Sequence, residues 1–176
     1  MSQETYSPEG YNTINPFVIT KEAPKLIEFL AKVFGAVEIP EAHTVDTDGL
    51  LLHSEPRLGD SVVMVADTKP GWPFTPSLLR VYVEDVERTL ATAEGLGATV
   101  VTKPTDFFGE ILSRFQDPWG NLWWVCQRGE QAQWEEGAGD TSWDESADEA
   151  SWDSQSEELT YIHETLLDTM SRLAKK

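Results

Sequence analysis

Cysteine is almost absent from this sequence, which has a single one, Cys126, among 176 residues. One thiol cannot form a disulfide within the chain, so the fold does not depend on an oxidising compartment. No apolar run approaches the roughly 20 residues that cross a bilayer, and the first residues lack the basic start and apolar stretch of a secretory signal. We therefore expect a cytoplasmic protein with no membrane partner.

Positive charge is also scarce, because 13 lysines and arginines stand against 31 acids and the net charge is -18. A field of this sign repels phosphate backbones, and no basic patch interrupts it, so we expect no nucleic-acid partner. The sequence also lacks a glycine-rich phosphate loop, a CxxC pair and a serine nucleophile elbow. None of those chemistries is indicated.

An internal repeat is the strongest pattern that is present. Gly35-Ala36 recurs as Gly97-Ala98 after 62 residues, and Gly59-Asp60 recurs as Gly120-Asn121 after 61 residues. Each unit has the pattern of a strand, a helix and several further strands. The equal spacing predicts one module duplicated within a single domain, because neither copy could bury its apolar face alone.

The predicted elements follow the same order in both modules. Residues 13–70 should hold strands at 17–20, 37–39, 49–55 and 61–66 with a helix at 21–34, and residues 56–60 should form a turn. Residues 76–128 should hold strands at 78–84, 99–102, 110–115 and 122–127 with a helix at 86–96. This order predicts an α+β fold with the helices on one face of the sheet, which leaves the other face to curl into a cup.

The composition changes after Arg128. Residues 129–156 form an acidic segment in which Trp134, Trp143 and Trp152 are nine residues apart. We interpret it as a solvated linker, although evenly spaced tryptophans could also dock in a groove of this protein or another.

The last predicted element is an amphipathic helix at residues 157–175. Ser154 and Glu157 form a capping box, and the apolar stripe consists of Leu159, Ile162, Leu166, Met170 and Leu173. A narrow stripe needs a partner, which could be the parent domain, a second subunit or another protein. We expect it to pack within its own assembly.

Several motifs together resemble a known superfamily. They are NPFVIT, IEFLAKVFGA, HSEPRLGDSVVMVAD, VYVEDVERTLATAEGLGATVV, FFGE and DPWGNLWWV, and they cover roughly residues 15–128. In this order they resemble the glyoxalase, bleomycin-resistance and dioxygenase proteins, also called vicinal oxygen chelate proteins, and within them the PhnB-like branch. The resemblance implies two βαβββ modules that form a cup-shaped site, often in a homodimer.

Enzymes of this superfamily typically hold a divalent metal with His, Gln or Glu side chains from the first and last strands of each module. The matching positions here fall near Asn15, Met64, Leu78 and Trp124, none of which is a usual ligand for zinc, nickel or iron. A shift of one residue in either direction brings in no such ligand. The sequence therefore predicts no metal and no other cofactor.

Side chains two apart on a strand share a face, so Arg80 and Tyr82 should face the cup if Leu78 does. Arg80 could then bind an anionic or carbonyl group through paired hydrogen bonds, or it could form an internal ion pair with Glu110 or Glu55. The aromatic-Gly-Glu stretch at 107–110 could cover the cup mouth or pack as an ordinary edge. We predict that the ligand-binding residues are Phe17, Leu78, Arg80, Tyr82, Phe107, Phe108, Glu110 and Trp124.

His53 and Glu55 are candidate catalytic residues, because two residues on one strand could shuttle a proton or keep part of a metal site. A surface pair is the alternative. We expect a metal-independent protein that binds a small organic ligand for sequestration, resistance or sensing. The alternatives are a glyoxalase-type lyase or isomerase or a dioxygenase with shifted ligands, and a protein-interaction module that acts through the acidic tail and helix.

Overall fold

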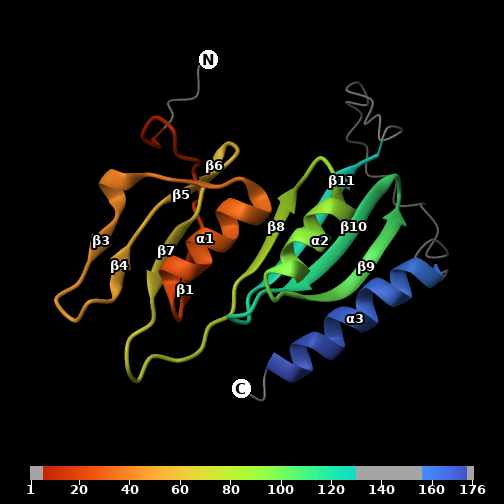
Figure 1. Cartoon of the computed structure of the whole chain (residues 1–176). Coiled ribbons are helices and arrows are strands. Elements are labelled where there is room, and N and C mark those ends of the chain that lie inside the picture. The colour runs from red at the N-terminus through yellow and green to blue at the C-terminus, as the bar shows by residue number, and fades with distance from the viewer. Residues whose placement is uncertain (1–5, 130–155, 174–176) are drawn as a thin grey trace, which may run out of the picture.

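The computed structural model describes residues 6–129 and 156–173. Figure 1 shows two βα halves side by side, with a third helix beside the second half. The elements in chain order are β1 (Phe17–Thr20), α1 (Ala23–Phe34), β2 (Val37–Glu38), a 3-10 turn (Pro40–Ala42), β3 (Thr44–Val45), β4 (Leu51–His53), β5 (Pro56–Leu58), β6 (Ser61–Val62), β7 (Met64–Asp67), β8 (Leu78–Tyr82), α2 (Val86–Gly95), β9 (Thr99–Phe107), β10 (Glu110–Gln116), β11 (Leu122–Arg128) and α3 (Glu157–Leu173). The predicted α+β class is confirmed, and the acidic linker falls almost wholly outside the described residues.

The first half has small sheets rather than one continuous sheet. β1 pairs with β7 in parallel, β5 lies between β2 and β6, and β3 pairs with β4. The turn predicted at 56–60 is wrong in part, because Pro56–Leu58 form β5 and the turn is confined to Gly59 and Asp60. Pro56 has no amide proton to donate, but its carbonyl accepts from Val63 at 3.0 Å, so the strand forms despite the proline.

The second half is a four-stranded sheet in the order β8-β11-β10-β9, with β8 and β11 parallel and the other pairs antiparallel. The Asp85 side chain accepts a hydrogen bond from the Arg88 amide at 2.9 Å and so caps α2, as its sequence position predicts. The β9 strand continues to Phe107, five residues beyond its predicted end at 102. Each half contains one parallel pair of strands, β1 with β7 and β8 with β11.

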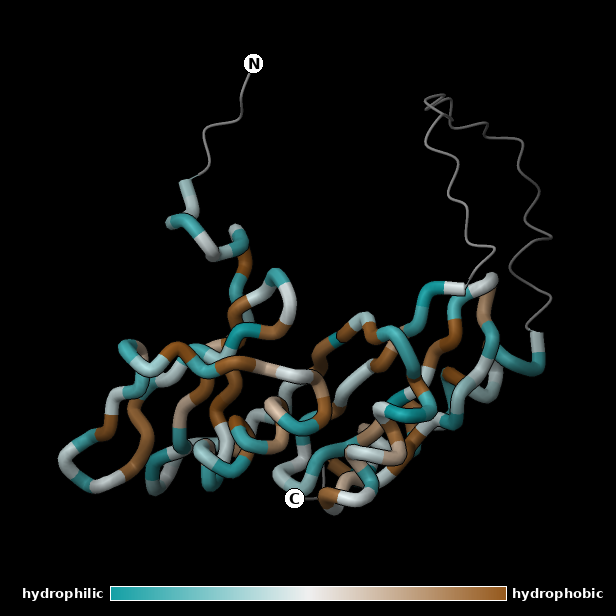
Figure 2. The backbone as a smooth tube through the Cα atoms, turned by 45° about the horizontal axis from the view of Figure 1, so that its top comes forward, coloured by the Kyte–Doolittle hydropathy of each residue, from teal (hydrophilic) through white to brown (hydrophobic). Residues whose placement is uncertain are grey.

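One core joins the two halves. Phe29 and Phe34 of α1 meet Phe115 of the second sheet with ring centroids 6.0 Å apart in both pairs, and Phe34 lies 5.3 Å from Trp123. Phe115 and Trp123 are fully buried in the same cluster as residues of α2. Hydrophobic stretches lie mainly along the strands and helices, and the outlying turns are more hydrophilic (Figure 2). Both helices therefore belong to one core, which fixes the halves against each other.

The third helix packs against its own chain. It runs beside β9 (Figure 1), and Ile162 packs with Leu112 and Cys126 in a second small cluster. The Oη of Tyr161 accepts from the Lys103 amide at 2.9 Å. None of the described helices is both long and apolar enough to cross a membrane.

Candidate functional site

The second sheet has two faces of different character. Leu79, Val81 and Val83 pack against the main core, whereas Leu78 and Tyr82 remain 45% and 57% exposed. Alternation along the strands therefore separates a helix-covered face from an opposite one. We call the opposite face the α3 face, because α3 covers part of it. It carries Leu78, Arg80, Tyr82, Glu110, Leu112, Arg114, Trp124 and Cys126.

Arg80 lies on the α3 face and is paired. Its Nη2 lies 2.5 Å from Oε2 of Glu110, and its Nε lies 3.1 Å from Sγ of Cys126. Tyr82 donates to Oε1 of the same carboxylate at 3.2 Å, and its ring lies 4.8 Å from the Arg80 guanidinium. Of the alternatives that the sequence left open, the ion pair with Glu110 is the one present. The pair is partly exposed, so its net contribution to stability is small.

Cys126 is a poor nucleophile. Burial raises the pKa of its thiol, and the hydrogen bond from Arg80 offsets only part of that effect. Thiolate is the reactive form, so a raised pKa keeps the sulfur inert at neutral pH. Cys126 serves as a small buried apolar residue beside Leu112, as its sequence context indicates.

A row of side chains crosses all four strands of the α3 face. The register aligns Arg80 of β8 with Trp124 of β11, Trp124 with Arg114 of β10, and Arg114 with Thr102 of β9. The guanidinium carbon of Arg114 lies 4.0 Å from the centre of the Trp124 ring. One indole therefore has a guanidinium in register on each side, which is a suitable arrangement for a flat group with negative charge.

Arg114 is the most deeply buried cation of this row, with 1% of its surface exposed. Its Nη1 donates to Oγ1 of Thr102 at 3.2 Å and to the carbonyl of Ile162 at 2.6 Å. Burial lowers the pKa of Arg114 to about 10, since no carboxylate of the described residues compensates the charge. Arg114 was not among the predicted site residues, although alternation from Glu110 places it on the same face.

Two buried donors on this face have no partner among the described residues. They are Nε of Arg114 and Nε1 of Trp124. Buried donors are nearly always satisfied in folded proteins, so these two nitrogens are candidates for an acceptor that the described residues do not supply.

Phe107 and Phe108 lie at the β9–β10 turn. Their ring centroids are 4.6 Å apart, Phe107 packs against the small cluster under α3, and Phe108 is 90% exposed. One ring therefore fills the edge of the α3 face and the other projects into solvent.

The remaining candidates gather on the first half. Nε2 of His53 lies 2.9 Å from Oε1 of Glu55, the Tyr11 hydroxyl donates to Oε2 of the same carboxylate, and Phe17 contacts His53 edge to face at 6.1 Å. Within the described residues, no hydrogen bond, ion pair or ring contact joins this group to Arg80, Tyr82 or Trp124. The structure thus divides the predicted site residues into two groups, one on each half.

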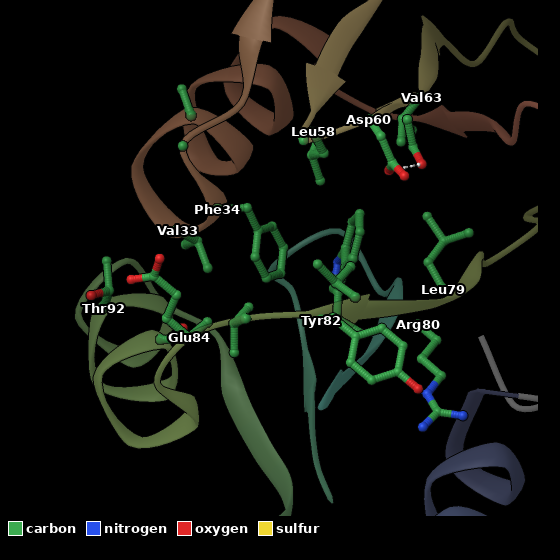
Figure 3. A pocket seen from close by; sticks show the side chains of 18 of the residues that line it. Val33, Phe34, Leu58, Asp60, Val63, Leu79, Arg80, Tyr82, Glu84 and Thr92 are labelled. Atoms are coloured by element: carbon green, nitrogen blue, oxygen red, sulfur yellow. Dashed lines mark hydrogen bonds between the residues drawn. The ribbon is translucent and has the colours of Figure 1, made fainter. Parts of the chain in front are cut away.

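A cleft of about 920 Å³ lies between the halves. Its walls come from the end of α1, the β5–β6 turn, β8 and the start of α2. Figure 3 shows Val33, Phe34 and Leu58 on one side of it, and Tyr82 and Arg80 at the edge that faces α3. Arg80 and Tyr82 therefore belong both to the lining of the cleft and to the α3 face.

The described side chains do not assemble a donor set for a divalent metal. In the described part of the chain, no three His, Cys, Asp or Glu side chains gather as a potential metal site. Of the four positions that the resemblance matches to metal ligands, Met64 on β7 and Leu78 on β8 carry apolar side chains. Neither side chain offers the nitrogen or carboxylate oxygen that such ions prefer.

Comparisons with known proteins give a consistent answer. The chain is 30% identical over 135 residues to the uncharacterized protein Mb0911c of Mycobacterium bovis, a match that covers 70% of this chain and 88% of that one. Its fold is similar to a glyoxalase/bleomycin resistance protein/dioxygenase family enzyme from Burkholderia phytofirmans, with a TM-score of 0.52 and 18% identity over 67% of this chain and 96% of that one. It is also similar to the fosfomycin resistance protein FosX of Listeria monocytogenes, with a TM-score of 0.53 and 16% identity over 65% of this chain and 91% of that one.

A family model for the glyoxalase-like domain matches residues 16–126, which span both halves and the whole described site except α3. The chain therefore belongs to the glyoxalase-like family.

Proposed function

We propose that this protein binds a small organic ligand on the α3 face and the adjoining cleft, without a catalytic metal, in a role of sequestration, resistance or sensing. The observation that carries the proposal is the combination of exposed Leu78 and Tyr82 with the Arg80–Trp124–Arg114 row. Apolar and aromatic walls with a few fixed polar groups are typical of sites for small ligands. The similar FosX protein is by its name a fosfomycin resistance protein, which supports a resistance role for this fold.

Each predicted residue has a place in this proposal. Tyr82 and Leu78 supply open contact area, and Trp124 supplies the floor. Because Glu110 already accepts from Arg80 and Tyr82, it holds both side chains at the border of the site. Phe107 and Phe108 border the same face at the β9–β10 turn.

A second copy of the chain completes the site in this proposal. Phe17 is 49% exposed on the first half and lies apart from the α3 face, so one chain presents two partial sites. A homodimer that places the first half of one copy against the second half of the other would bring Phe17, His53 and Glu55 toward Tyr82 and Arg80.

The test is native mass spectrometry of the protein as purified, followed by identification of any co-purified compound. Tyr82→Ala should lose that compound, because it removes an aromatic side chain that is 57% exposed and leaves the core unchanged. Leu167→Ala, on the exposed side of α3, is the matched control and should retain it. Retention of the same amount of compound by Tyr82→Ala would refute the proposed location.

A further inference from the structure

Arg114 has an unusual set of partners for a buried guanidinium. Its Nη1 is satisfied by a threonine hydroxyl and by the main-chain carbonyl of Ile162, both of which are uncharged. Its charge has no carboxylate partner among the described residues, and its Nε has no acceptor. A buried charge is costly unless an opposite charge or a full set of hydrogen bonds compensates it. The site is therefore built around a cation that the described part of the chain does not neutralise.

One of the two acceptors of Arg114 comes from α3, and the other is the Thr102 hydroxyl of β9. Ile162 is the buried apolar contact of that helix on the α3 face, and its carbonyl lies 2.6 Å from Nη1 of Arg114. A single carbonyl oxygen is a neutral acceptor. A carboxylate has two oxygens with negative charge and accepts paired, charge-assisted hydrogen bonds from a guanidinium. The helix thus supplies a weaker form of the interaction that an organic acid would supply.

We propose that Arg114 and Trp124 form a binding site for the carboxylate of a flat aromatic acid, and that α3 covers this site and is displaced when the acid binds. The inference rests on the proposed function and names the ligand class of the same face. It assigns the anion to Arg114 rather than to Arg80, because Glu110 already neutralises Arg80.

The surroundings favour an aromatic acid over a small inorganic anion. The Trp124 ring lies against the guanidinium, and Tyr82 and Phe107 flank the same face. A flat ring can stack in this setting while its carboxylate reaches Nε of Arg114 and Nε1 of Trp124, the two donors without partners among the described residues.

The attachment of α3 is light enough for displacement. Along its 17 residues only Ile162, Thr169 and Leu173 are buried. Its polar contacts with the sheet are the Tyr161 hydroxyl on the Lys103 amide, the Thr165 hydroxyl on Thr102, and the Ile162 carbonyl on Arg114. Elements with few buried apolar contacts open at low free energy.

The experiment uses the full chain with benzoate as the probe and benzamide as its uncharged match. Ile162→Ala weakens the cover, so we expect it to raise benzoate affinity by about tenfold, which is about 1.4 kcal/mol. Leu167→Ala, exposed on the same helix, should leave the affinity unchanged. Benzamide should bind at least about tenfold more weakly than benzoate to the wild type, Ile162→Ala and Leu167→Ala, because it lacks the charge.

Arg114→Gln in the Ile162→Ala background should abolish the gain and remove the preference for benzoate over benzamide. Hydrogen exchange of the wild-type chain provides a second readout that does not depend on how this variant folds. Saturating benzoate should speed exchange of the α3 amides in residues 157–173. Slower or unchanged exchange with bound benzoate, or a benzoate preference that survives Arg114→Gln, would overturn the inference. A co-purified compound lost in Tyr82→Ala would still support the proposed function in that case.

Discussion

Glu55 shows how a single carboxylate organises the first half. Hydrogen bonds from Tyr11 and His53 lower its pKa from the ordinary value of 4.5. The folded chain therefore holds this proton less tightly than the unfolded chain does. The interaction stabilises the fold above pH 4.5 and is lost as the pH falls through the lower folded value.

Glu55→Gln should therefore reduce the free energy of unfolding by about 1 kcal/mol at neutral pH, because the amide accepts weaker hydrogen bonds than the carboxylate. Urea titrations across the acid range measure the effect. The difference between wild type and variant should shrink as the pH falls from 4.5 through the lower pKa of the folded state, where the folded wild-type carboxyl becomes protonated. Glu84→Gln, at an exposed residue, is the control. A difference that grows toward acid pH would contradict this role.

At the site, sequence patterns predicted the strand face on which a residue lies but not its distant partners. Alternation from Leu78 correctly separated Arg80 and Tyr82 from Val81, because it needs only the two-residue period of a strand. The partner of Arg80 was left open, since Glu110 and Glu55 are both far away in sequence. Alternation from Glu110 places Arg114 on the same face, but its burial depends on α3, and nothing in the sequence indicates which strand that helix covers.

At the scale of elements, two glycines of the second half have opposite requirements. Gly120 has φ +102°, and a Cβ there would lie 2.8 Å from the ring of Phe74. Gly95 is the last residue of α2, and a Cβ at that position would meet no neighbouring segment within 4 Å. The turn therefore requires a glycine at Gly120, whereas nothing around Gly95 requires one.

Gly120→Ala should lower the free energy of unfolding by more than about 1 kcal/mol, because alanine is strained at this φ and Phe74 must move. Gly95→Ala should raise it by about 0.5 kcal/mol through helix propensity. Thermal and urea unfolding of the two variants measure both effects in one scaffold. Equal effects of the same sign would contradict the distinction.

The elements also divide by how well the sequence predicted them. The helices α1, α2 and α3 were predicted, because amphipathic spacing is a local signal. The short strand β3 was not predicted, and the prediction at 56–60 was wrong for β5, because strands of two or three residues exist only through pairing with a distant partner. β9 continues to Phe107, beyond its predicted end at residue 102, because its last residues pair with β10.

At the scale of the whole molecule, the core that joins the two halves leaves large apolar residues exposed on both of them. The core packs α1 against the second sheet, so the two halves are joined through their helix-covered sides. The large apolar residues left exposed include Phe17 on one half and Leu78 and Tyr82 on the other. Large apolar patches that remain exposed on a protein surface often mark sites of interaction with a partner.

The proposed homodimer gives the last prediction. Sedimentation of the full chain should show a concentration-dependent dimer, and Leu78→Asp should raise the dissociation constant at least about tenfold, because it places a charge in the apolar contact. Leu167→Asp, on the exposed side of α3, adds the same charge and should have little effect. Each copy carries a net charge of -18, so raising the salt from low to physiological ionic strength should strengthen the dimer by screening the repulsion. Equal weakening by both aspartates would assign the effect to net charge rather than to the Leu78 surface. A monomer under all conditions would contradict the proposed homodimer.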